Sequence, residues 1–333
     1  FGWCGHRDGL TFTHGRGSVK GQAPEATHCT HIGPVHRKAI HEVFRMWFGV
    51  EATEYSNRLP ADRLTCWTPE AAKELAPKTL SDLLGPLADE RAKAAPLPAT
   101  LAKLLGGVDP AGKPTAKGVS RDVVGGVAVE KVLLTTEPGI TVPLVLLVPP
   151  RADGKRPPVV VGFAQAGKAK LLTERAGDAA ELLAAGVAVC LPDLRGTGES
   201  AVGGRGRTSA ATAVSASLQM LGDTLLGGQV RDVRAVLAWL RTRDDLDAAR
   251  PALWGDSLAK PNPPETNFAV PRDDDAALPP GPEPGGPLAA LLAAVYEPDV
   301  RAVYARGGLS AYRSALGSHL TLVPHDALVP GIA

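Results

Sequence analysis

After the N-terminal third of the chain, apolar residues fall into short runs that alternate with segments of helical spacing. The runs at 127–136 and 140–148 flank Pro138 and Gly139, a pair that favours a tight turn, and they predict a β-hairpin. Further strand-length runs, separated by stretches with an apolar residue every three or four positions, occupy 157–164, 187–193, 252–254 and 300–306. This alternation predicts an α/β domain with a doubly wound, mostly parallel sheet, in which ligands bind at the carboxyl ends of the strands.

The N-terminal part has a different pattern. Residues 35–48 place apolar side chains on one face of an amphipathic helix, which Gly49 ends. Two more helical stretches, separated by prolines, lie within 68–105. We therefore expect three regions: a histidine-rich segment and helix over 1–60, a helical linker or extension over 61–118, and the α/β core over 119–333.

Composition and charge restrict the classes of partner. Among 333 residues, 44% are hydrophobic and 21% are charged, which is typical of a folded globular protein. The net charge of +1 provides no overall field that would attract nucleic acid or an anionic membrane. No apolar run approaches the roughly 20 residues of a membrane span. We expect a small-molecule or carbohydrate substrate. The start at Phe1 leaves the compartment open, a secreted or periplasmic one included.

A serine follows the short apolar run at 252–254. Gly255 lies two residues before Ser257 and Ala259 lies two residues after it, where Gly is more usual. Small residues at these positions are typical of a nucleophile elbow, because the turn from strand to helix leaves no room for bulky side chains. The alternative is a serine that caps a helix N-terminus. The first interpretation makes Ser257 a catalytic nucleophile at the end of a strand and the start of a helix.

An acyl-transfer serine needs backbone amides that stabilise the oxyanion. One would be the amide of Leu258, directly after the nucleophile. The second would come from the loop after the strand at 157–164, where Gln165 or Ala166 is the candidate donor and Gly167 allows close approach. A plain turn between strand and helix is the alternative for this loop.

Four segments together resemble one branch of the α/β-hydrolases, the acetyl xylan esterase and prolyl-oligopeptidase-like branch. These segments are 130–150, 159–168, 186–200 and 252–259. The resemblance covers roughly 120–333, and it is strongest in a D-x-R-G-x-G-x-S turn formed by Asp193, Arg195, Gly196, Gly198 and Ser200. It implies an α/β-hydrolase fold and ester hydrolysis through a Ser, Asp, His triad in that chain order. The nucleophile carries over onto Ser257.

The acid and the histidine do not carry over in the same way. His325 and Asp326 are adjacent and in the wrong order, so we expect both partners, and the C-terminal strands of the fold, to lie beyond Ala333. An alternative is that residues 1–60 are the tail of a preceding hydrolase module, or that they supply His31 or His28 to Ser257. The remaining triad candidates are therefore His31 and Asp326. A metal site at His28, Cys29 and His31 lacks a second ligand pair, so we expect no metal and no cofactor.

Three functions follow from this reading. The first is a serine carboxylic-ester hydrolase, with a carbohydrate acetyl ester of the xylan type as substrate. The second is a serine peptidase of the prolyl-oligopeptidase type, against which the lack of any propeller-type repeat argues. The third is an inactive fragment or a binding module with a hydrolase fold.

Overall fold

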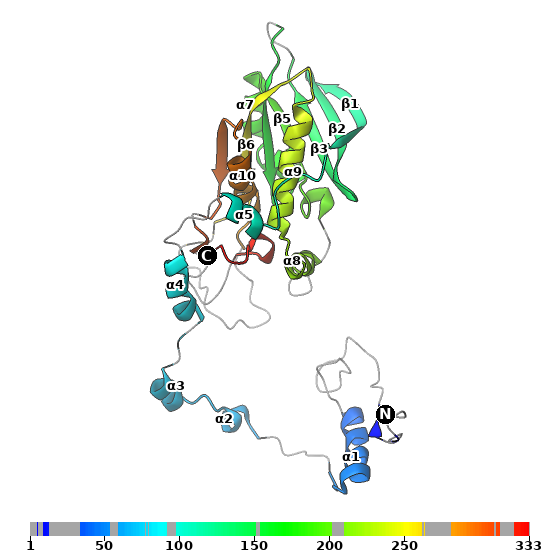
Figure 1. Cartoon of the computed structure of the whole chain (residues 1–333), viewed down its shortest axis with the longest axis vertical. Coiled ribbons are helices and arrows are strands. Elements are labelled where there is room, and N and C mark those ends of the chain that lie inside the picture. Colours follow the sequence, from blue (N-terminus) through cyan, green and yellow to red (C-terminus); the bar gives the residue numbers. More distant parts are fainter. Residues whose placement is uncertain are drawn as a thin grey trace. The chain divides into compact units, whose positions relative to one another are not determined.

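The computed structural model describes residues 5, 9–12, 34–53, 59–76, 78, 80–91, 98–150, 154–201, 210–261, 263, 281–309, 311–313 and 323–332. The chain divides into two compact units, Phe1–Pro77 and Lys78–Ala333 (Figure 1). The boundary at Pro77 lies inside the segment that we expected to be a helical linker.

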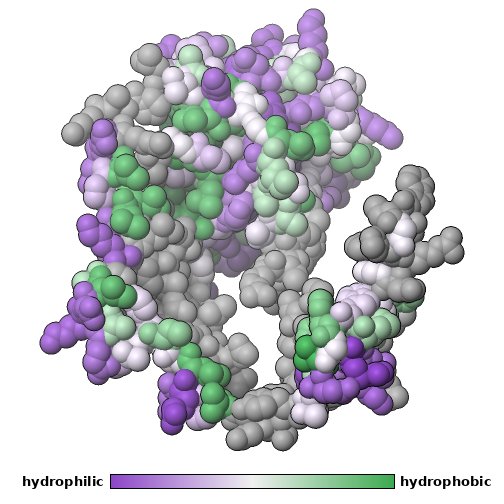
Figure 2. Space-filling model, turned by 60° about the horizontal axis from the view of Figure 1, so that its bottom comes forward, coloured by the Kyte–Doolittle hydropathy of each residue, from purple (hydrophilic) through white to green (hydrophobic). Residues whose placement is uncertain are grey.

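The N-terminal unit contains three described helices, α1 (Pro34–Phe48), α2 (Ala61–Leu64) and α3 (Pro69–Leu75). The helix predicted over 35–48 is therefore confirmed. Helix α3 begins where the sequence allows it, because the Thr68 side chain accepts a hydrogen bond from the Ala71 amide and a proline occupies the first turn. The aromatic rings of Phe44, Trp47 and Phe48 meet edge to face on α1 and are exposed. Apolar residues also reach the surface elsewhere on the face shown in Figure 2.

The described residues of the larger unit form one sheet of seven strands in the order β1-β2-β3-β5-β4-β6-β7. Neighbours are antiparallel from β1 to β5 and parallel from β5 to β7. The predicted hairpin is present as β2 and β3. The strands are β1 (Thr115–Val124), β2 (Val127–Glu137), β3 (Ile140–Val148), β4 (Pro158–Ala164), β5 (Ala188–Pro192), β6 (Asp247–Asp256) and β7 (Ala302–Arg306).

Successive residues of a strand point to opposite faces of the sheet. Both faces of this sheet carry apolar side chains, and helices cover both. On β4, Val161 and Phe163 belong to the larger core, which α9 and α10 complete, whereas Ala164 packs with Leu171 of α6 in a second core that α7 extends. The helices of this unit are α4 (Leu80–Arg91), α5 (Pro98–Leu104), α6 (Lys168–Glu174), α7 (Ala176–Ala184), α8 (Ala210–Met220), α9 (Leu225–Leu240) and α10 (Gly285–Tyr296). The doubly wound α/β architecture is confirmed.

Two parts of the larger unit were not predicted from the sequence. Strand β1 pairs with β2, yet nearly all of its residues are exposed, so it shows no alternation of apolar and polar positions. The sequence predicts a linker over 61–118, which includes α5, but Leu101 of this helix and the adjoining Leu105 lie in the larger core. Among the described helices, none has the length and apolar character needed to cross a bilayer.

Candidate active site

Ser257 directly follows β6, which lies between β4 and β7 and runs parallel to both. Its amide donates to the Arg306 carbonyl at 3.0 Å, which continues the β6–β7 pairing by one residue. The residue is buried, with 8% of its surface exposed, and among the described residues no hydrogen bond involves its hydroxyl. The strand and the position of Ser257 at its carboxyl end therefore agree with the prediction. This edge is where parallel sheets bind ligands.

The prediction that a helix begins at Ser257 is wrong for the described residues. Residues 257–261 have no regular structure, and the next described helix is α10. The sequence explains the difference, because Pro261 and Pro263 cannot donate the hydrogen bonds of a helix and disfavour helical backbone in the residues before them.

The end of β6 nevertheless packs closely against the start of α10. A Cβ on Gly286 would lie 2.5 Å from the Asp256 carbonyl oxygen, and one on Gly255 would lie 2.5 Å from the Gly286 carbonyl oxygen. Gly286 therefore provides the close approach that the sequence reading assigned to Ala259. Residues 258–284 are inserted between the serine and the helix. The Gly285-Gly286 pair before the apolar run of α10 was the available signal.

The structure shows which groups the candidate oxyanion donors contact. The Leu258 amide donates to Oε2 of Glu283 at 3.2 Å. In the loop after β4, it is the Gln165 side chain that makes the contacts: its Oε1 accepts from the Gly285 amide at 3.2 Å and its Nε2 lies 3.4 Å from Oδ2 of Asp326. Gln165 thus joins the start of α10 to Asp326. The roles of Leu258, Gln165 and Ala166 as donors stay predictions.

The turn Asp193–Ser200 is held by a buried carboxylate. Asp193 is 1% exposed and accepts hydrogen bonds from the Lys168 amide at 2.6 Å, the Lys168 ammonium at 2.6 Å and the Glu199 amide at 2.8 Å. Lys168 also pairs with Glu199. Gly198 has a φ of +48°, and a Cβ there would lie 2.2 Å from the Asp193 carboxyl. Asp193 therefore fixes the loop after β4 to the turn after β5.

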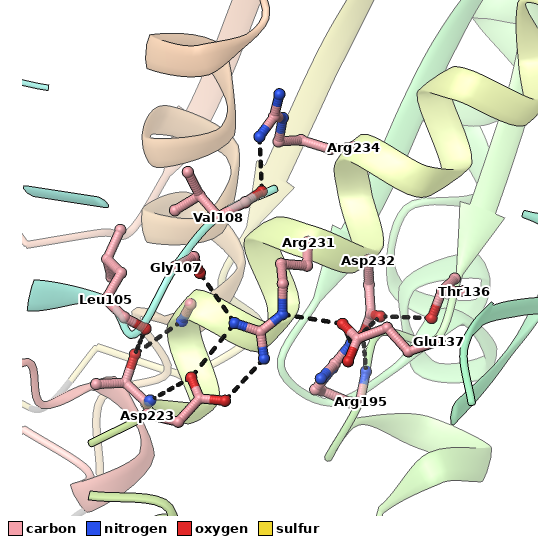
Figure 3. A network of polar contacts seen from close by, with 12 residues as sticks. Leu105, Gly107, Val108, Thr136, Glu137, Arg195, Asp223, Arg231, Asp232 and Arg234 are labelled. Carbon is pink, nitrogen blue, oxygen red and sulfur yellow. Dashed lines mark hydrogen bonds and ion pairs between the residues drawn. The ribbon is translucent and has the colours of Figure 1, made fainter. Parts of the chain in front are cut away.

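Arg195 of the same turn anchors a second network, shown in Figure 3. Asp232 is fully buried and accepts from the Arg195 amide and guanidinium, and from the hydroxyl of Thr136 at 3.0 Å. Glu137 bridges Arg195 and Arg231 at 2.6 and 2.9 Å. Burial alone would lower the pKa of Arg195. The hydrogen bonds and charges of Asp232 and Glu137 outweigh this effect, so the pKa lies above its ordinary value. The network ties α9 to β2 and to the turn after β5.

The acidic residue before the serine is a structural anchor. Asp256 is fully buried and accepts from Nε of Arg175 and from the Trp254 indole, each at 3.0 Å. Arg175 lies between α6 and α7. The contact therefore holds the end of β6 against these helices, and it satisfies the carboxylate without the serine.

The triad candidates are only partly placed by the structure. His325 does not meet Ser257: its Nδ1 lies 3.1 Å from Oγ of Ser215. His31, like His28 and His319, lies outside the described residues. Asp326 contacts Gln165 rather than a described imidazole. Within the described part of the chain no group of three His, Cys, Asp or Glu side chains is placed to bind a metal ion.

The burial of Asp326 predicts how its substitution changes the stability of the fold with pH. Burial raises its pKa, and backbone hydrogen bonds and His325 only partly oppose this. Since the pKa is higher in the folded chain than in the unfolded one, the folded state binds the proton more tightly, and the associated stability is lost as pH rises through this range. We expect Asp326→Asn to raise the free energy of unfolding in urea at pH 7, and the gain to vanish at about pH 3, where both forms are neutral.

The control for this substitution is Asp299→Asn, because the Asp299 side chain is 62% exposed. Its stability should change little at either pH. An Asp326→Asn protein that is less stable than the wild type at pH 7 would contradict the conclusion that burial raises the pKa of Asp326.

Comparisons with known proteins give structural matches only. No family model and no curated protein matches the sequence. A candidate acetyl xylan esterase from Bacteroides fragilis superposes with a TM-score of 0.53 at 16% identity, over 70% of this chain and 59% of that one. Acetyl xylan esterase 1 from Thermoanaerobacterium sp. gives 0.38 at 20% identity, over 61% and 55%. A glucuronoyl esterase from Solibacter usitatus gives 0.37 at 16%, over 60% and 54%.

This chain therefore spans less than two thirds of the length of each of these proteins. At such low identity the Bacteroides match establishes the fold and no more. The sheet order, the helices on both faces and this superposition agree with one another. The larger unit of the chain has the α/β-hydrolase fold.

Proposed function

We propose that the chain carries the core of a serine carboxylic-ester hydrolase with Ser257 as its nucleophile. The observation that carries the proposal is the place of Ser257, buried directly after β6 at the carboxyl edge of the parallel strands. A cavity of about 510 Å³ begins at the next residue, and Leu258 and Ala259 belong to its wall. We place the ester in this cavity because its wall begins directly after Ser257 in the sequence, although Ser257 itself does not line it.

The proposed reaction has two halves. In the first, Ser257 Oγ attacks the acyl carbon and gives its proton to a base, while the carbonyl electrons move onto oxygen. Collapse of this intermediate expels the alcohol, which takes the proton. In the second, water attacks the acyl-serine and releases the acid. A histidine is the expected base, with His31 as the candidate, and Asp326 is the candidate acid. Neither role rests on a contact in the structure.

The substrate proposal is an acetyl ester of a carbohydrate. The cavity wall carries the charged side chains of Lys170, Glu174, Arg175, Lys260 and Glu283. Such a wall suits a hydroxyl-rich alcohol better than a long acyl chain, which needs apolar contact. The candidate acetyl xylan esterase with the same fold supports the same class.

Two observations favour a second candidate function. The Leu258 amide is already engaged by the Glu283 carboxylate, and among the described residues no imidazole contacts Ser257. A hydrolase-fold binding module without catalysis would show both features. It would bind a carbohydrate in the same cavity and leave the serine unreactive.

Covalent labelling separates the two functions. A fluorophosphonate reacts with an activated serine, and we expect mass spectrometry of the labelled chain to place the adduct on Ser257. The Ser120→Ala variant should label to the same extent, because Ser120 lies on β1 at the far side of the sheet. A native chain that takes up no label, or takes it up at another serine, would remove Ser257 as nucleophile and favour the binding module.

A further inference from the structure

A carboxylate occupies the amide that the proposed reaction needs. Oε2 of Glu283 accepts a hydrogen bond from the Leu258 amide at 3.2 Å, and Leu258 directly follows Ser257. The Ser257 amide, by contrast, is held by the Arg306 carbonyl in the sheet. Chain pairing therefore stops at Ser257, and the next amide is free to bind another acceptor. In this structure that acceptor is an anionic oxygen.

The position of Glu283 is built into the fold. It precedes α10 by two residues, and the Gly285 amide donates to Gln165 while Gly286 packs against the Asp256 carbonyl. These contacts fix the backbone beside the end of β6. Rotation of the Glu283 side chain alone would therefore be enough to release the Leu258 amide.

The same cavity offers the carboxylate a second place. Glu283 and Leu258 belong to its wall together with Lys170 and Lys260, neither of which has an ion pair with another described residue. Arg175, the third cation of the wall, is engaged by Asp256. A rotated Glu283 would remain near positive charge, so its release from the amide does not leave an isolated anion.

We propose that Glu283 is an internal competitor of the ester: its carboxylate fills the oxyanion position at the Leu258 amide and must leave before the acyl oxygen can bind. This inference rests on the proposed esterase function. The tetrahedral intermediate and the Glu283 carboxylate both offer a negatively charged oxygen to the same donor, and an amide proton serves one such acceptor at a time.

The test compares three variants in hydrolysis of p-nitrophenyl acetate. Glu283→Ala removes the competitor, and we expect kcat/KM to rise on the order of tenfold, the effect of freeing one charge-assisted hydrogen bond. Glu283→Gln keeps a neutral, weaker acceptor and should give a smaller rise. Glu181→Ala, which removes an exposed carboxylate of α7 that does not line this cavity, should leave the rate unchanged.

A second readout does not depend on activity. A hydrogen bond to a carboxylate moves an amide proton downfield, so the Leu258 amide resonance should move upfield in Glu283→Ala and stay in place in Glu181→Ala. If Leu258 does not respond, or if both Glu283 variants lose activity or keep the wild-type rate, the competitor role is wrong while the esterase function stands. If neither the wild type nor any variant hydrolyses the ester, the esterase function fails and the competitor role fails with it.

Discussion

Replacement of Ser257 by alanine is expected to lower kcat/KM for p-nitrophenyl acetate by a factor of roughly 10³ or more, because the variant can form no acyl-enzyme. The fold should survive the change. Among the described residues the Ser257 hydroxyl makes no hydrogen bond, and its amide, which bonds to Arg306, is kept by alanine. Initial rates of ester hydrolysis, with thermal unfolding measured alongside, separate loss of chemistry from loss of structure.

The matched control is Ser120→Ala. The Ser120 hydroxyl is buried and has no hydrogen-bond partner among the described residues, so its removal breaks no hydrogen bond. The rate should stay unchanged, and the stability should stay the same or rise slightly. A Ser257→Ala protein that keeps the wild-type rate and melting temperature would show that any hydrolysis arises elsewhere on the chain.

The largest loss of stability is expected for Asp193→Ala, at about 3–5 kcal/mol. The substitution leaves the Lys168 ammonium, whose side chain is 8% exposed, without its buried partner, and it frees the two amides that Asp193 now binds. Breaking one side of a buried ion pair costs more than the pair itself contributes, because the remaining charge stays desolvated. Urea unfolding at neutral pH measures the difference.

Two further variants show whether the loss of the buried carboxylate beside Lys168 is the cause. In the double variant Asp193→Ala with Lys168→Met no charge is left buried, so part of the loss should be recovered. Asp178→Ala removes a carboxylate that pairs with Arg306 at 3.4 Å on the surface, and it should cost no more than about 1 kcal/mol. Equal losses for Asp193→Ala and Asp178→Ala would contradict a special role for the buried pair.

Local patterns were sufficient for much of the fold. Strands β4 and β5 are short apolar runs because both of their faces are buried, and Pro138-Gly139 identifies the hairpin. Strand β1 could not be found in this way. It is held by pairing with β2 and leaves nearly all of its residues exposed, so its stability comes from the partner strand rather than from its own composition.

In the candidate site, too, local sequence patterns predict some features and miss others. The Gly-x-Ser string after a strand placed Ser257 correctly at the sheet edge, because this relation is local in sequence. The contact between Leu258 and Glu283, and that between Asp256 and Gly286, join residues on opposite sides of a long insertion. Nothing in the spacing of residue types indicates that the two ends of this insertion meet. The same holds for Lys168 and Asp193, which are 25 residues apart.

The insertion at 258–284 leaves and re-enters the domain at nearly the same point, since the Leu258 amide reaches Glu283. The entropy of closing such a loop depends only weakly on its length, and each doubling costs about 0.6 kcal/mol. Its two anchor points belong to the end of β6 and the start of α10, which the sheet and core hold independently of what lies between. The segment can therefore lengthen, shorten or be exchanged beside the serine at little cost to folding. Under the proposed esterase function, such an exchange would change which ester is accepted while the α/β core stays the same.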